Sequence, residues 1–166
     1  MIPESLNGVD HIPGDIVDMV HQSVINTFSS LTGDEPVKVE GDVSNEPLNG
    51  IIGNIAVFNP HHTLSLMLAI PKGTAVALST VFLGMELPFE SDDMGDLIGE
   101  ISNILAGEAA ANIETVGFRG QSSLPTSTRG SDLTLFMPNK PPIEKMKYES
   151  SKGEFWLNMA LSESKS

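Results

Sequence analysis

The chain of 166 residues contains no cysteine. That absence excludes a disulfide framework, a zinc site with cysteine ligands and a cysteine nucleophile. Basic residues are scarce too: Lys and Arg number 9 against 22 Asp and Glu, which gives a formal net charge of −13. Such a surface repels nucleic acid and anionic lipid, so we expect neither nucleic acid nor a membrane as a partner. The length predicts a single domain over residues 1–166 with a sizeable core.

Long apolar runs and several common catalytic motifs are also missing. The longest apolar stretch, near Ala75–Met85, is too short to span a bilayer and contains polar residues. The first residues lack the basic and apolar regions of a secretory signal, so we expect a soluble, cytoplasmic protein. There is no P-loop, dinucleotide fingerprint, nucleophile elbow or H-E-x-x-H motif. The adjacent His61 and His62 point to opposite faces if they lie in a strand, so we expect no metal site there.

The hydrophobic periodicity predicts an α+β fold, with helices packed on one face of a largely antiparallel sheet. In the segment Leu64–Ile70, leucine and isoleucine alternate with Ser65, Met67 and Ala69, which indicates a half-buried strand. The tail Ser162–Ser166 is polar, and we expect it to fray. The predicted helices are Pro13–Leu31, Thr74–Met85 and Met94–Glu114, and the predicted strands are Val37–Val43, Gly50–Phe58, Leu64–Ile70, Leu133–Met137, Met146–Tyr148 and Phe155–Leu161, the last two joined by a hairpin at Ser150–Gly153.

The helix Met94–Glu114 carries the most informative pattern. Asp96, Glu100 and Asn103 stand at i, i+4 and i+7, and with Gly107 they fall within an arc of roughly 60°. The surrounding side chains are apolar or very small. Such a helix presents one carboxylate–amide strip to a partner, although an ordinary solvated polar edge would give the same pattern.

The other faces of this helix predict its packing. Leu97, Ile98, Ile101, Ile104, Leu105 and Ala109 form a broad apolar sector that would face the core. Small residues recur as Gly95, Gly99, Ser102, Ala106 and Ala110, and this stripe would allow a second helix to approach closely. Ser91, with Asp92 and Asp93 after it, suits the start of the helix.

A faint internal similarity links this helix to the first one. Asp18 and Gln22 can be laid over Asp96 and Glu100, with Ile25 in the place of Asn103. Two amphipathic helices match this well by chance, so both readings remain open. If the repeat is real, the first copy has lost its polar strip.

The polar strip and the residues after it resemble the CheC/CheX/FliY family of chemotaxis phosphatases. The shared pattern is Asp96-x-x-x-Glu100-x-x-Asn103, continued by Ile-Leu-Ala-Gly107 and by Ser123-Leu-Pro125-Thr. The family pattern has its proline about 22 residues after the asparagine, and here 21 residues lie between Asn103 and Pro125, which is the same spacing. One good copy of the motif makes the chain more similar to CheX than to CheC, which carries two.

The resemblance implies a phosphatase that acts on a phosphorylated CheY-like response regulator. Asn103 would position the attacking water, and Glu100 would pair with the active-site lysine of the regulator. Asp96, Gly107 and Pro125 would support docking. The resemblance implies no cofactor or metal in this chain, because Mg²⁺ would be supplied in the active site of the partner.

Two other functions remain open. The same fold could serve as a non-catalytic adaptor that docks a regulator or a motor component, although an intact Asn103 favours catalysis. An unrelated domain that binds a small molecule would show a concave apolar pocket instead of an exposed strip. By resemblance we expect a homodimer, and the long apolar strand Phe155–Leu161, if it lay at an open edge, would favour pairing between copies.

Overall fold

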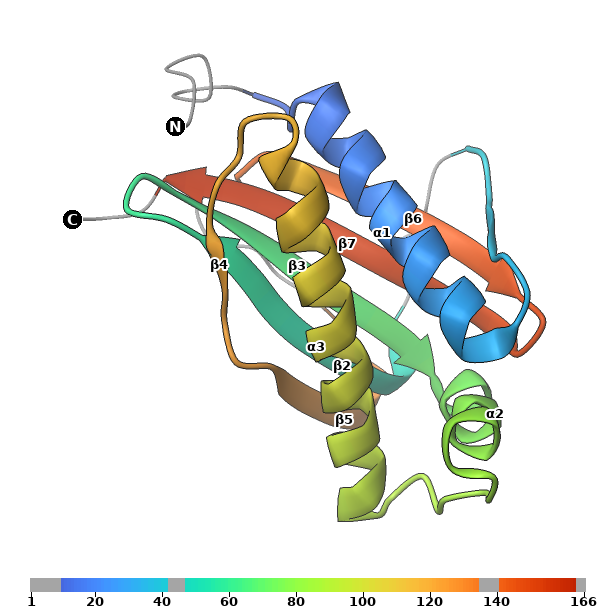
Figure 1. The fold of residues 1–166 in the computed structure, drawn as a ribbon. Coiled ribbons are helices and arrows are strands. Elements are labelled where there is room, and N and C mark those ends of the chain that lie inside the picture. The colour runs from blue at the N-terminus through green and yellow to red at the C-terminus, as the bar shows by residue number, and fades with distance from the viewer. Residues whose placement is uncertain (1–9, 42–46, 135–140, 164–166) are drawn as a thin grey trace.

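The computed structural model describes residues 10–41, 47–134 and 141–163. They form one curled antiparallel sheet with helices on one face (Figure 1). The strands lie in the order β1-β6-β7-β3-β2-β4, and β5 follows β4 along the same edge of β2. The α+β class predicted from the sequence is confirmed. The helices are α1 (Gly14–Thr32), α2 (Lys72–Leu83) and α3 (Asp92–Glu114), and the strands are β1 (Val37–Lys38), β2 (Leu48–Phe58), β3 (His62–Pro71), β4 (Gln121–Ser122), β5 (Thr126–Leu133), β6 (Ile143–Ser150) and β7 (Gly153–Glu163).

The core lies between the sheet and the helices α1 and α3. Its aromatic centre is a stack in which the ring of Phe155 lies 4.1 Å from that of Phe28 and 5.1 Å from that of Tyr148. Each such ring removes a large apolar area from water, so this stack fixes α1 on β6 and β7. The helix α3 contributes the buried side chains Met94, Leu97, Ile98, Ile101, Leu105, Ala109 and Ile113.

The strand β3 is buried on both faces, which corrects the half-buried reading. Met67 and Ala69, predicted to face solvent, are 6% and 7% exposed. They pack with Ile52 into a second apolar cluster on the face of the sheet that the helices do not cover, against Leu133 and Trp156 at its margin. Period-two alternation marks two faces but does not say whether the second face is covered.

The strand β7 lies inside the sheet between β6 and β3, so the condition under which its apolar run would favour pairing between copies, an open edge, is not met. Ser162 and Glu163 belong to β7 and pair with Thr63 and His62, so the frayed tail is wrong for these two residues. Residues 164–166 lie outside the described residues. The hairpin at Ser150–Gly153 is confirmed.

The predicted helices are confirmed with small shifts at their ends. Gly33 and Gly84 end α1 and α2 with positive φ angles of 81° and 73°, which glycine adopts without strain. The helix α2 begins at Lys72 and ends at Leu83, two residues earlier at each end than predicted. Of the predicted strand Val37–Val43, residues 37 and 38 form β1, and residues 42 and 43 lie outside the described residues, as does the end of Leu133–Met137. None of the helices in the described ranges is long and apolar enough to cross a membrane.

Candidate functional site

The helix α3 begins with a conventional N-terminal cap. The Ser91 hydroxyl accepts a hydrogen bond from the Met94 amide at 3.3 Å and donates one to the Pro88 carbonyl at 2.7 Å. Asp92 and Asp93 occupy the first turn, where negative charge interacts favourably with the helix dipole. This start fixes which residues of α3 face outward.

The strand β5 holds α3 on one flank. The Arg129 guanidinium donates through Nη1 to the carbonyls of Phe89 and Ser91, at 3.2 and 2.8 Å. Further along, the Ser127 hydroxyl donates to the Gly95 carbonyl at 3.4 Å. These contacts connect β5 to the segment before α3 and to its first turns, so the position of the helix relative to the sheet edge is well defined.

The small-residue stripe of α3 faces strands, which corrects the prediction of a second helix. Gly95 lies beside Ser127, and Gly99 lies beside Pro125, whose Cγ is 4.0 Å from the position that a Cβ on Gly99 would occupy. Beneath the helix, Ser102 lies directly on Gly53 of β2. The curled sheet brings β2 and β5 close to α3, and a small side chain serves a close strand as well as a close helix.

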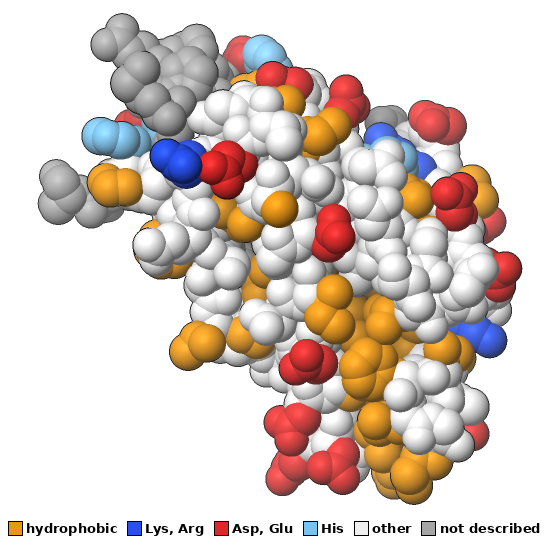
Figure 2. Space-filling view, viewed as in Figure 1, with side chains coloured by type: hydrophobic (Ala, Val, Ile, Leu, Met, Phe, Trp, Pro, Cys, Tyr) orange, Lys and Arg blue, Asp and Glu red, His pale blue; other side chains and the backbone are white. Residues whose placement is uncertain are grey.

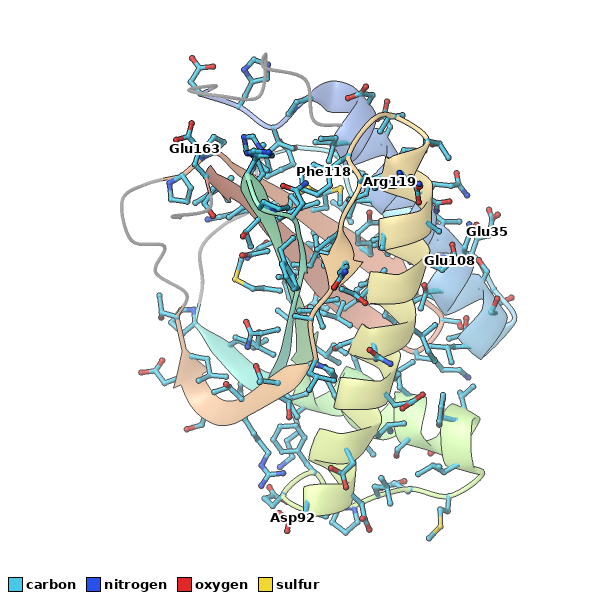
Figure 3. The ribbon with its side chains drawn as sticks, turned by 60° about the vertical axis from the view of Figure 1, so that its left-hand side comes forward. Glu35, Asp92, Glu108, Phe118, Arg119 and Glu163 are labelled. Atoms are coloured by element: carbon cyan, nitrogen blue, oxygen red, sulfur yellow. The ribbon has the colours of Figure 1, made fainter. Side chains whose placement is uncertain are left out.

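The side chains of Asp96, Glu100 and Asn103 are all exposed, as the sequence predicts. None of the three makes a hydrogen bond or an ion pair through its side chain with any described residue. Figure 3 shows α3 from Asp92 at its start to beyond Glu108, with β5 on one side of the helix and α2 on the other. These side chains therefore form a surface of carboxylate and amide groups to which no other described side chain or backbone group is bound. We call Asp96, Glu100, Asn103 and Gly107 the polar strip.

The polar strip has a different neighbour on each side. Ile104 follows Asn103 and is 38% exposed, although the sequence placed it in the buried sector. On the other side lies Pro125, half-buried against Gly99, as expected for a residue that shapes the flanking loop. Gly107 is exposed, and a Cβ there would meet nothing within 4 Å, so the packing of the fold does not require glycine at this position.

Negative charge gathers at the start of α3, and apolar side chains gather over α2 and beside α3 (Figure 2). The apolar group includes Phe82, Leu83 and Met85, which are 38%, 48% and 60% exposed. Glu90 lies just before α3. A hydrogen bond from the backbone amide of Glu90 itself, and then the neighbouring charge of Lys72, lower the pKa of its carboxyl group. The acidic character of this end suits a partner that presents positive charge.

The first helix does not reproduce the polar strip. Asp18 and Gln22 are exposed on α1, but Ile25 is half-buried and packs against the core. The Gln22 amide donates to the Asn26 side-chain oxygen at 2.9 Å, so these two amides bind each other. Of the two helices, only α3 carries an exposed acid and amide in the expected spacing without a side-chain partner among the described residues.

The adjacent histidines lie at the turn between β2 and β3. The Asn59 side-chain oxygen accepts from the amides of His61 and His62, both at 2.9 Å, and so forms the turn between β2 and β3. His61 is exposed and His62 is 2% exposed. Within the three described ranges, no group of three or more His, Asp or Glu side chains is arranged to hold a metal ion.

Comparison with known proteins identifies the family. Residues 51–143, more than half of the chain, match the family model described as chemotaxis phosphatase CheX. The chain belongs to the CheX family. The matched segment contains the polar strip and Pro125, so the CheX resemblance expected from these residues is confirmed.

Solved structures share the CheX fold at low sequence identity. A CheC-like superfamily protein from Shewanella sp. PV-4 is 17% identical, with a TM-score of 0.81, over 91% of this chain and 99% of that one. The chemotaxis protein CheX from Vibrio vulnificus is 18% identical, with a TM-score of 0.80, over 90% and 100%. The CheX in a CheX–CheY–BeF₃–Mg²⁺ complex from Borrelia burgdorferi is 13% identical, with a TM-score of 0.73, over 89% and 97%. A search of the curated proteins finds no match.

Sequence reasoning missed the residues that position the strip. Arg129, Ser127 and Gly53 contact α3 or the segment before it across 38, 32 and 49 residues of sequence, respectively (129 − 91, 127 − 95 and 102 − 53). Leu124 was quoted only as part of a motif, yet it is 88% exposed beside Pro125. No signal in the sequence singles it out, because isolated exposed apolar residues are common on protein surfaces.

Proposed function

We propose that this chain hydrolyses the aspartyl phosphate of a CheY-like response regulator. The observation that carries the proposal is that Glu100 and Asn103 lie one turn apart on α3, exposed and without a side-chain partner among the described residues. Two such groups on a rigid helix can enter the active site of a partner with their geometry already set. The family match and the CheX–CheY complex from Borrelia burgdorferi support a regulator as the substrate.

In the proposed reaction, a water oxygen attacks the phosphorus of the acyl phosphate. The bond between phosphorus and the aspartyl oxygen breaks, the carboxylate of the regulator leaves, and inorganic phosphate carries the water oxygen away. The Asn103 amide both donates and accepts hydrogen bonds, so it can orient this water in line with the breaking bond. No strong base is required, because the task is orientation. Mg²⁺ bound by the regulator would stabilise the charge on the transferred phosphoryl group.

The other residues of the site have supporting roles in this proposal. Glu100 pairs with the active-site lysine of the regulator and sets the register of docking. Asp96 contacts the rim of the partner at the start of the strip. Gly107 leaves the helix backbone open to a close approach, since a side chain there would project into free space. Pro125 holds the loop beside Asn103 against Gly99.

The decisive experiment replaces Asn103 with alanine. N103A is expected to lower the rate of regulator dephosphorylation by on the order of 10²-fold while binding stays near wild type, because only water positioning is lost. E100A is expected to weaken binding as well as turnover. The matched control is N26A, which removes an exposed helical asparagine from α1. If N103A is as fast as wild type, the chain is the non-catalytic adaptor instead.

A pocket that binds a small molecule has no support at this site, since the side chains of Asp96, Glu100 and Asn103 are exposed on the surface of α3. Three expectations stay proposals: a single domain over 1–166, a cytoplasmic location and a homodimer. The dimer rests on the family resemblance alone, because the strand that argued for it lies inside the sheet. Sedimentation separates a dimer from a 17.7 kDa monomer.

A further inference from the structure

The segment that joins β4 to β5 is one residue longer than the segment of β2 that lies opposite it. Ser122 pairs with Val57 and Thr126 with Asn54, so three residues on this side face two on β2 (123 to 125 against 55 and 56). An extra residue of this kind is a β-bulge, which turns a side chain away from the regular alternation of the strand. The residue in the middle of this bulge is Leu124.

Leu124 is held rigidly although it is exposed. The amide of Ser123 donates to the Ala56 carbonyl at 2.8 Å, and the Ser123 hydroxyl accepts from the Ala56 amide at 2.9 Å. On the other side, Pro125 lies against Gly99 of α3. The chain is therefore fixed immediately before and after Leu124, while its side chain is 88% exposed. Because the backbone on either side is already fixed, a partner that covers Leu124 does not have to order the loop around it.

The position of Leu124 connects it with the polar strip. Gly99, which contacts Pro125, lies one turn before Asn103 on α3. On the helical wheel Asn103 is on the side of Gly99, and Glu100 is on the side of Ile104. Leu124, which precedes Pro125 in the chain, therefore belongs to the segment on the Asn103 side of the acid–amide pair, and Ile104 lies on the Glu100 side; both are exposed. Apolar side chains beside a polar pair help to exclude water from it when a partner covers the surface.

We propose that Leu124 is a docking residue that inserts into an apolar crevice beside the phosphorylation site of the receiver domain. This inference rests on the proposed function, since the occupant is the same phosphorylated regulator. The polar strip supplies acidic groups for the cationic site of the receiver. When that site docks on Glu100 and Asn103, the receiver must also cover the apolar surface beside the polar strip, which includes Leu124. Leu124 would therefore determine affinity for the regulator without taking part in the reaction.

The test measures binding and turnover separately, with the regulator that the wild-type protein dephosphorylates. Binding is measured by titrating the beryllofluoride-activated receiver domain, and turnover by release of phosphate. L124S is expected to raise Kd and KM about tenfold, equivalent to about 1.4 kcal/mol, and to change kcat less than twofold. L124M keeps an apolar side chain of similar volume and is expected to restore Kd to near the wild-type value.

V37S is the matched control, because Val37 is 65% exposed on β1, at the opposite edge of the sheet from β4 and β5. V37S should leave Kd unchanged. If L124S binds the receiver with an unchanged Kd while the wild-type protein dephosphorylates the regulator, the docking role of Leu124 is wrong and the proposed function stands. A loss of self-association in L124S with unchanged Kd would assign Leu124 to a contact between copies of this chain. Failure of the wild-type protein to dephosphorylate any regulator would overturn both proposals.

Discussion

The contact between Gly53 and Ser102 determines how closely α3 approaches the sheet. A Cβ on Gly53 would collide with the Ser102 hydroxyl and would lie 3.1 Å from the Ser102 Cβ. The hydroxyl is fully buried and donates to the Ile98 carbonyl at 2.7 Å, so it can leave only by breaking that bond or by lifting the helix. The substitution G53A therefore perturbs stability and the position of the polar strip together.

The expected cost follows from three contributions. Overpacking a close contact costs about 1–3 kcal/mol, and loss of the Ser102 hydrogen bond costs about 0.5–1.5 kcal/mol. The lower chain entropy of alanine in the unfolded state returns about 0.4–1 kcal/mol. Because the strain is relieved either by moving the hydroxyl or by moving the helix, the first two costs do not add fully. We expect G53A to lower the free energy of unfolding by about 1–2 kcal/mol.

A double-mutant cycle with S102A isolates this contact. S102A removes the hydroxyl that collides, so G53A should cost less in that background, with a coupling energy of about 1 kcal/mol. Urea denaturation followed by circular dichroism measures the four free energies. G53A alone is also expected to reduce kcat, because a small lift of α3 displaces Asn103 from the attacking water, and S102A should restore much of that loss. A coupling energy of zero would show that this contact does not set the height of the helix.

Two further predictions concern single residues. G107A should raise the free energy of unfolding by about 0.5–1 kcal/mol in urea denaturation, because its Cβ meets nothing in a helix interior; a loss of stability would contradict this. Burial, and then the charge of Lys38, lower the pKa of His21 in the folded state, so unfolding takes up a proton below the unfolded pKa of about 6.5. Stability present above that pH is lost as pH falls through the lower native pKa, so wild type should lose more stability between pH 7.5 and 5.5 than H21Q; equal losses in the two proteins would contradict this.

The face of α3 that carries the site could be predicted from sequence because it depends on local spacing. Asp96, Glu100 and Asn103 are exposed for the same reason that Ile98 and Leu105 are buried: helical periodicity assigns each residue to a side. The N-terminal cap at Ser91 is equally local. The hairpin between β6 and β7 follows from a short turn between two apolar runs.

What covers each face could not be predicted, because it depends on pairing between distant segments. The small-residue stripe indicates a close neighbour, but the choice of β5 and β2 over a helix follows from the curl of the sheet. Likewise, the pattern of Phe155–Leu161 identifies a strand, and only its pairing with β3 places it inside the sheet. Ile104 shows the same limit within α3, since its position in the apolar sector did not reveal that its neighbours leave it partly exposed.

The distinction between catalysis and docking depends on one side chain. A surface that only binds a regulator needs charge and apolar area, and Glu100, Asp96 and Leu124 supply both. An exposed asparagine adds little to such a surface, because water satisfies its amide equally well in the free protein. Its amide becomes valuable when it must hold a single water in one orientation, excluded from solvent by the partner and by the apolar residues around the strip. The kinetic effect of N103A at constant affinity is therefore the measurement that separates a phosphatase from an adaptor built on the same helix.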